Sequence, residues 1–197
     1  MQHDLTASPP VTDVNDICAY EHFKECLRIE VLNRDGKKKF SWFKIFHRVA
    51  FGYKKNFYFW WRLANYLHTQ PSERKRKWAR RINHGLLRKY GADISVAAFS
   101  SPGMKLNHYV GIVVRAESVI GKNINLRQNI TIRRKDSKNL GGKVYIGDNC
   151  EISAHTCIIG NIRIGDNVTI GAMSFFNKDV PGDSVVYSEK SMSVRLK

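Results

Sequence analysis

One large apolar residue recurs every six positions towards the end of this chain of 197 residues. The series consists of five isoleucines and one phenylalanine, at Ile146, Ile152, Ile158, Ile164, Ile170 and Phe176. A period of six fits neither an α-helix, which repeats every 3.6 residues, nor an ordinary strand, which alternates every two. It is typical of a coil with three short flat faces, in which each hexapeptide forms one face and stacked coils bury a column of large side chains.

The repeat extends back towards the middle of the chain. A weak start spans residues 94–106, and a second series runs through Val114, Ile120, Leu126 and Ile132. The step from Leu106 to Val114 is eight residues instead of six, which predicts two extra residues around 108–111. The polar, glycine-ended segment 133–143 predicts a loop extruded from the coil, and Pro181 predicts the end of the stack because proline cannot donate to a strand ladder.

The first half of the chain has helical periodicity instead. We expect a loose arm at 1–15, an α-helical N-terminal domain at 16–90, a β-helix domain at 91–187 and a basic tail at 188–197. A basic helix is predicted to begin after Ser72, as a candidate N-cap, and to end at Gly91. The expected fold class is mainly β, with an α-helical N-terminal domain.

The formal charge of +16 is concentrated in one segment, because residues 34–89 hold 17 Lys and Arg against Asp35 and Glu73. Within it, residues 37–62 combine cations with Trp and Phe, the composition of helices that lie on a membrane surface. The alternative is that these aromatic residues form the core of the helical domain and pack against neighbouring subunits. No recognised motif supports nucleic-acid binding, and no nucleic-acid partner is expected.

Membrane-spanning and metal-binding signals are not found in the sequence. No apolar run approaches the roughly 18 residues that a spanning helix needs. The first residues, Met-Gln-His-Asp, lack the basic and then apolar form of a secretory signal, so a cytoplasmic protein is expected, with peripheral contact to the inner membrane through 37–62 as the open alternative. The four cysteines show no metal-ligand spacing, and no metal is expected.

Four ordered segments make residues 85–190 resemble the hexapeptide-repeat acyltransferases. They are Gly91-Ala92-Asp93-Ile94, Leu106-Asn107-His108-Tyr109-Val110-Gly111-Ile112-Val113-Val114, Val119-Ile120-Gly121-Lys122-Asn123, and Ile170-Gly171-Ala172 with Lys178-Asp179-Val180-Pro181. More narrowly, the chain resembles the branch related to serine acetyltransferase that modifies bacterial surface polysaccharides of the colanic-acid and capsule types. The resemblance implies a left-handed parallel β-helix, acetyl-CoA as co-substrate, and a homotrimer with active sites between adjacent subunits.

The resemblance also implies a catalytic pair. In serine-type members the His before Gly-Ile-Val-Val is the general base, and an Asp fifteen residues earlier orients it; His108 and Asp93 match these positions. Acetyl transfer to a hydroxyl needs a base with a pKa near neutrality, and a carboxylate on the other imidazole nitrogen fixes the tautomer. The alternative is that His108 is a surface histidine and Asp93 a residue at the end of a helix.

The residues expected to bind the acceptor depart from the serine enzymes. Those enzymes carry Asp immediately before the catalytic His, where this chain has Asn107, and an Arg-His pair in the extruded loop, where residues 133–143 contain no His. Both departures remove groups suited to a zwitterionic amino acid and predict a sugar hydroxyl as the acceptor. The candidate substrate-binding residues are Asn107, Tyr109, Gln128, Arg133 and Arg134. Solvated loop charge accounts equally well for the two arginines.

The donor site is expected along the coils. Related sugar acetyltransferases line the coenzyme A slot with small residues on two coils and a Lys before Asp-Val-Pro, which correspond to Ala154, Ala172 and Lys178. A further C-terminal Arg in such members corresponds to Arg195, although Met192 stands where another basic residue is common. Small side chains let the pantetheine arm approach the backbone, and cations bind its phosphates.

These observations predict an O-acetyltransferase that moves acetyl from acetyl-CoA to a sugar hydroxyl of a bacterial surface polysaccharide or its precursor. Two alternatives stay open. One is a serine O-acetyltransferase, and the other is an inactive β-helix scaffold that binds an anionic surface.

Overall fold

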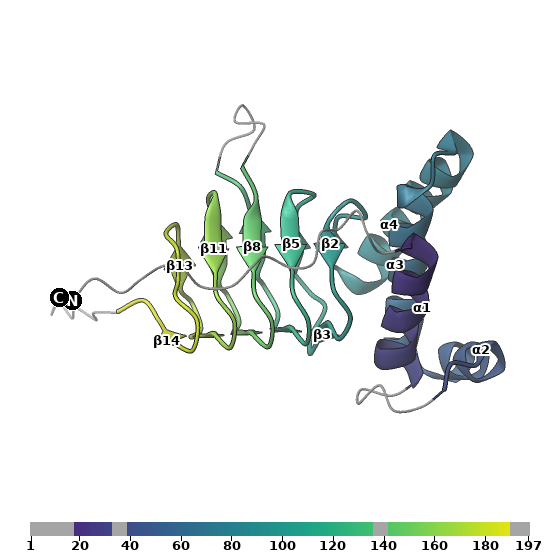
Figure 1. The fold of residues 1–197 in the computed structure, drawn as a ribbon, viewed down its shortest axis with the longest axis horizontal. Helices are drawn as coiled ribbons and strands as arrows, with labels where there is room; N and C mark the ends of the chain where they lie inside the picture. The colour runs from purple at the N-terminus through teal and green to yellow at the C-terminus, as the bar shows by residue number, and fades with distance from the viewer. Residues whose placement is uncertain (1–17, 33–38, 136–141, 190–197) are drawn as a thin grey trace, which may run out of the picture.

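The computed structural model describes residues 18–32, 39–135 and 142–189, and it places a group of helices on one end of a parallel β-helix (Figure 1). The helices are α1 (Ala19–Leu27), its one-turn π-helical continuation η1 (Arg28–Leu32), α2 (Trp42–Phe51), α3 (Tyr53–Thr69) and α4 (Glu73–Tyr90). Fourteen short strands follow in the described residues: β1 (Asp93–Ile94), β2 (Phe99–Ser100), β3 (Lys105–Leu106), β4 (Val113–Val114), β5 (Ser118–Ile120), β6 (Asn125–Leu126), β7 (Thr131–Arg133), β8 (Val144–Ile146), β9 (Glu151–Ile152), β10 (Cys157–Ile159), β11 (Ile162–Ile164), β12 (Thr169–Ile170), β13 (Phe175–Phe176) and β14 (Val185–Val186).

The strands form three parallel sheets that make the three faces of the coil. Their orders are β1-β4-β7-β10-β13, β11-β8-β5-β2 and β14-β12-β9-β6-β3. Each strand therefore pairs with the strand one coil away, as a stack of triangular coils requires. The five isoleucines of the sixfold repeat are all buried, and Phe176 packs against the same core, so the predicted repeat is confirmed.

Asparagines form a ladder along one corner of the coils. Asn123, Asn149 and Asn167 have φ of 56–57°, a left-handed conformation that asparagine tolerates better than most residues. The amide of each donates to the side-chain oxygen one coil further on, ending at Asp183, with distances of 2.8–3.2 Å. These bonds satisfy corner side chains and keep successive coils in register.

The two extra residues predicted around 108–111 lie in the corner between β3 and β4. This corner contains residues 107–112, whereas the next one along the sheet, between β6 and β7, contains only 127–130. The longer corner reaches the helices, where Tyr109 is buried against Phe57 and Tyr90, with ring centroids 4.8 and 5.1 Å away.

A buried ion pair joins the helices to the first coil. Arg62 of α3 makes two hydrogen bonds to Glu30 of η1, at 2.6 and 2.9 Å, and also donates to the carbonyl of Ser100, at 2.7 Å. Ser100 occupies the core position that Ile120 and Ile146 fill on later coils of the same sheet. The first coil therefore has a small polar residue there because a guanidinium, and not another coil, lies beside it.

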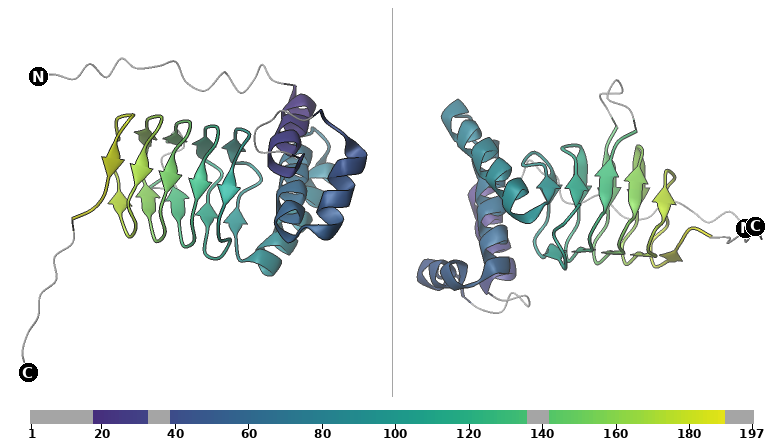
Figure 2. Two further views of the ribbon diagram at one scale, coloured as in Figure 1. Left: turned by 90° about the horizontal axis from the view of Figure 1, so that it is seen from below. Right: turned by 180° about the vertical axis from the view of Figure 1, so that it is seen from behind.

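The predicted basic helix is confirmed as α4, and Gly91 ends it in the left-handed conformation, with its N–H donating to the carbonyl of Leu87 at 2.8 Å. Ser72 is the N-cap residue of this helix, as predicted, although its side chain makes no capping hydrogen bond. The views in Figure 2 show the helices stacked against the end of the β-helix where the first coil lies.

Candidate active site

His108 lies in the long corner between β3 and β4, and its side chain is exposed. Backbone hydrogen bonds join this corner to the strand that carries Asp93. The N–H of Gly111 donates to the carbonyl of Gly91 at 2.9 Å, and the N–H of Asp93 donates to the carbonyl of Ile112 at 2.8 Å. The fold thus brings the two segments of the predicted catalytic pair onto adjacent coils.

No hydrogen bond or ion pair links the side chains of that pair in the described part of this single chain. Asp93, whose side chain is 40% exposed, instead has its Oδ2 4.0 Å from Nη1 of Arg115. Arg115 was missed in the sequence because no motif marks it; it comes next to Asp93 through the pairing of β1 with β4. The orienting role of Asp93 stays a prediction.

Three other predicted residues share one corner of the β-helix. Gln128, Ala154 and Ala172 each follow the buried core residue of their strand by two positions, and those core residues are in register on successive coils. The N–H of His155 donates to the carbonyl of Gln128 at 3.1 Å, and the N–H of Met173 donates to that of Ala154 at 2.9 Å. This row continues to the corner of His108, since the N–H of Asn129 donates to the carbonyl of Val110 at 3.0 Å.

The predicted cations lie along the side of sheet β1-β4-β7-β10-β13 that is opposite to the corner of His108. Arg133 ends β7, Arg134 follows it, and Lys178 comes two residues after β13. Arg134 forms an ion pair with Glu117 at 3.5 Å and lines a hollow of about 410 Å³ with Asn161 and others. Sheet β1-β4-β7-β10-β13 therefore has the corner of His108 at one side and these cations at the other. Arg195 lies outside the described residues.

Asn107 opens on a polar cavity between the helices and the coils. Its Nδ2 donates to Oδ1 of Asn125 at 2.9 Å. The cavity has a volume of about 220 Å³ and is also lined by Lys54, Lys55 and Lys105. Sequence reasoning missed these lysines because α3 and β3 are far apart in the chain and only the tertiary fold brings them together.

Tyr109 points into the helix–coil junction. Burial raises the pKa of its hydroxyl above the ordinary range, with the neighbouring Tyr58 as a further cause, and this hydroxyl donates to the carbonyl of Lys54 at 3.4 Å. Its role in substrate binding stays a prediction.

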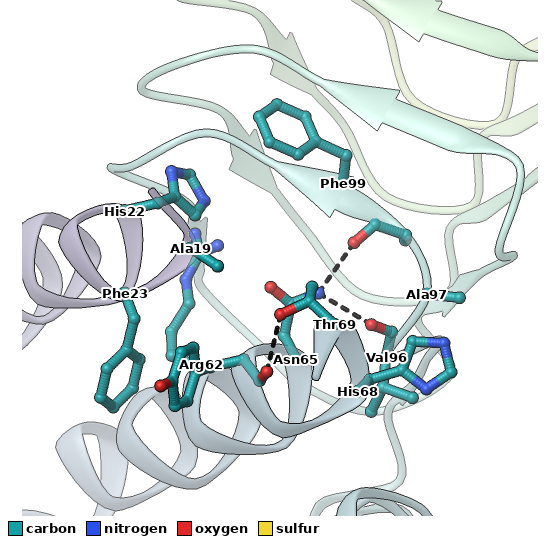
Figure 3. Close-up of a pocket in the computed structure, with 12 residues that line it drawn as sticks. Ala19, His22, Phe23, Arg62, Asn65, His68, Thr69, Val96, Ala97 and Phe99 are labelled. Atoms are coloured by element: carbon teal, nitrogen blue, oxygen red, sulfur yellow. Dashed lines mark hydrogen bonds between the residues drawn. The ribbon is translucent and has the colours of Figure 1, made fainter. Parts of the chain in front are cut away.

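A separate cavity of about 170 Å³ lies between α1, α3 and the first coil (Figure 3). His22 stacks on Phe99 there, with ring centroids 5.3 Å apart. Burial, together with the charge of Arg62, lowers the pKa of His22 to about 4. None of the predicted site residues lines this cavity. In the described ranges, no cluster of three or more His, Cys, Asp or Glu is arranged to hold a metal ion.

Known proteins resemble both parts of the chain. Residues 140–178 match the family model described as bacterial transferase hexapeptide (six repeats). Over 107 residues the chain is 31% identical to serine acetyltransferase 2 of Arabidopsis thaliana, which covers 54% of this chain and 33% of that protein. The chain thus spans about a third of that relative's length.

Two solved structures share the architecture. The serine acetyltransferase of Neisseria gonorrhoeae in complex with serine has a TM-score of 0.64 and 25% identity, covering 89% of this chain and 68% of that one. Serine acetyltransferase isoform 3 of Entamoeba histolytica, in complex with cysteine, has a TM-score of 0.68 and 23% identity, covering 91% of this chain and 61% of that one. The second likeness shows the fold alone.

The predicted polysaccharide acceptor was wrong, because these relatives and structural neighbours are serine acetyltransferases. The departures at Asn107 and in the 133–143 loop were weighted too heavily, since loss of individual charged groups changes how an acceptor is held without identifying another acceptor. The predicted sugar partner and the predicted role in capsule synthesis were wrong for the same reason. Residues 140–178 thus match the hexapeptide repeats of bacterial transferases, and the chain as a whole is similar to serine acetyltransferases.

Proposed function

We propose that the chain is an acetyl-CoA-dependent O-acetyltransferase whose acceptor is the hydroxyl of L-serine. The observation that carries the proposal is the likeness to serine acetyltransferases, which includes a solved enzyme with serine bound and extends over 89% of this chain. The exposed His108 on the long corner supports it, because a general base must be accessible to both substrates.

In the proposed reaction His108 accepts the proton of the serine hydroxyl as its oxygen attacks the thioester carbonyl carbon. The tetrahedral intermediate then breaks its C–S bond, and the imidazolium returns the proton to the leaving thiolate of coenzyme A. Such a base contributes about 10²–10⁴-fold in rate. Asp93 holds the imidazole tautomer, and backbone N–H groups of the coil stabilise the oxyanion.

Acetyl-CoA is proposed to lie along the corner defined by Gln128, Ala154 and Ala172. Two of these three residues are alanines, which lets the pantetheine arm approach the coil backbone. Lys178 and Arg195 are proposed to bind its phosphates. Left-handed winding and a trimer with sites between subunits complete the proposal, and a trimer would add a neighbouring subunit's residues to a site that is open on one chain.

Asn107 is proposed to accept a hydrogen bond from the serine ammonium through Oδ1, since its Nδ2 already donates to Asn125. A neutral amide binds a cation more weakly than a carboxylate does. We therefore expect a higher KM for serine than an aspartate at this position would give.

The test is to incubate the full chain with acetyl-CoA and L-serine and to separate free coenzyme A and O-acetylserine by chromatography. A thiol reagent is unsuitable, because Cys18 is an exposed free thiol. Release of coenzyme A is expected with L-serine, and L-alanine should give none because it lacks the hydroxyl. The rate of release should fall by about 10²–10⁴-fold in His108→Ala. Release that is equal with alanine, or absent with serine, would contradict the proposal.

A further inference from the structure

The aromatic side chains of α2 and α3 divide into two sets. Phe57, Tyr58, Phe59 and Trp61 of α3 are buried, as expected of a helical core. In α2, by contrast, Phe43, Phe46 and Phe51 are 82%, 57% and 83% exposed. The core therefore accounts for these four residues of α3, whereas Tyr53 and Trp60 of α3 and the three phenylalanines of α2 lie on the surface of the described chain.

The fold holds α2 by its opposite side. Ile45 and Val49 are buried, and Arg48 donates to the carbonyls of Val31 and Leu32 at the end of η1. Because an α-helix repeats every 3.6 residues, Phe43 and Phe51 then point outward. Phe46 lies at the side of this face, where its ring contacts Trp42 and Phe59 and is still 57% exposed. All views place α2 at the end of the molecule remote from the coils (Figures 1 and 2).

The exposed rings lie among cations. The cation Lys44 is exposed on α2 itself, and Lys39 is exposed just before it; the polar ring of His47 is exposed beside them. With Phe43 and Arg48 these three residues line a hollow of about 490 Å³. The sequence contains neither Asp nor Glu from residue 36 to residue 72, so no acidic side chain in that stretch offsets these charges.

We propose that this outer face of α2, defined by Phe43, Phe46, Phe51, Lys39, Lys44 and His47, docks on an anionic lipid bilayer. Aromatic side chains enter the boundary between headgroups and acyl chains, while adjacent cations bind lipid phosphates. Such contact is peripheral, since none of the described helices combines the length and hydropathy of a membrane span.

Charge favours a lipid surface over a second copy of the chain. A twofold contact brings the same patch of two subunits together, so Lys39 and Lys44 of one subunit would lie against the same cationic patch of the other. Like charges held together at an interface are unfavourable, whereas an anionic surface neutralises them. Docking through α2 would also leave the coils, at the other end of the molecule, free in solution. This proposal does not depend on the acetyl acceptor.

The experiment is co-sedimentation of the full chain with vesicles of phosphatidylcholine alone or with one-third phosphatidylglycerol. Binding is expected only to the anionic vesicles, and it should weaken as salt rises because the charges are exposed. The double variant Phe43→Ser/Phe51→Ser and the double variant Lys39→Glu/Lys44→Glu should each weaken binding by about tenfold or more. Trp78→Ser and Lys122→Glu, at exposed positions on α4 and on the coils, are the matched controls and should bind like the parent chain.

Circular dichroism and CoA release establish that the variants are folded and active, since α2 carries none of the proposed catalytic residues. Equal binding to neutral and anionic vesicles, no binding to either, or equal loss in the control variants would overturn the proposal. A change in molar mass by light scattering in the Phe43→Ser/Phe51→Ser variant would also overturn it, because that result would make the face a contact between subunits.

Discussion

At the scale of single residues, the environment of each histidine differs more than its sequence context suggests. His108 is exposed on a corner of the coil, whereas His22 is largely enclosed and its Nε2 lies 3.2 Å from the carbonyl oxygen of Ser100. The difference arises because α1 packs on the first coil, a contact between residues 78 positions apart. No local pattern around His22 predicts it.

The lowered pKa of His22 predicts a pH-dependent stability. The pKa of about 4 in the folded chain lies below the ordinary histidine value of 6.5, so between these values the unfolded chain binds more protons than the folded one. The contribution of neutral His22 to the free energy of unfolding is therefore fully present above pH 6.5 and is lost as pH falls towards 4. The expected loss is about 2 kcal/mol, after allowance for partial solvent exposure.

Urea unfolding of the parent chain and of His22→Phe at pH 7 and pH 4.5 checks this expectation. The variant keeps a ring beside Phe99 but cannot titrate, so the stability difference between the two proteins should shift by about 2 kcal/mol in favour of the variant at the lower pH. The contributions of other titrating groups are the same in both proteins and cancel in the comparison. A difference that does not change with pH would show that His22 is not held neutral in the folded protein.

At the scale of elements, Gly111 allows the long corner to form. Its φ is +71°, and a Cβ at this position would overlap Oδ1 of Asn129 on the next coil. Gly111→Ala is expected to destabilise the protein by about 1–3 kcal/mol and to lower activity, because the same corner carries His108. Gly85→Ala in α4 is the control, since nothing lies within 4 Å of its added Cβ.

The two substitutions should have opposite signs, because alanine is favoured over glycine by about 1 kcal/mol inside a helix. Thermal unfolding measures both. If Gly111→Ala were as stable and as active as the parent chain, the corner would not require a left-handed residue.

The regular elements could be predicted from the sequence because their signals are local. The sixfold spacing of Ile146 to Phe176 predicted the stacked coils, and the eight-residue step after Leu106 predicted the long corner. The end of α4 at Gly91 also follows from a local sequence signal. The cavity beside Asn107 was not predictable, since Lys54 and Lys105 meet there only through the packing of α3 on the first coil. Arg115 beside Asp93 was not predictable for the same reason, since only the pairing of β1 with β4 brings the two together.

At the scale of the whole molecule, one core runs through both the helices and the coils. Most buried hydrophobic residues from Phe23 of α1 to Val180, between β13 and β14, belong to a single cluster, which crosses the boundary predicted at residues 90 and 91. Glu30 and Arg62 are the buried charged residues at this junction in the described part of the chain. Oε1 of Glu30 also accepts hydrogen bonds from the N–H groups of Gly103 and Met104 at 3.1 and 3.0 Å. The ion pair therefore connects three segments and not merely two side chains.

This arrangement predicts that Arg62→Met destabilises the whole chain by about 3–5 kcal/mol, because it leaves the Glu30 carboxylate buried without its partner. The double variant Arg62→Met/Glu30→Gln should recover more than half of that loss, since a neutral amide oxygen still accepts from Gly103 and Met104. The control Arg80→Met removes an exposed arginine paired with Glu73 and should cost less than about 1 kcal/mol. Urea unfolding followed by circular dichroism and by tryptophan fluorescence measures all three variants. Because the core is shared, both signals should change in one transition. A separate early transition of the helices would show that the ion pair does not couple helices to coils. A loss of stability in Arg62→Met no larger than in the control would show the same.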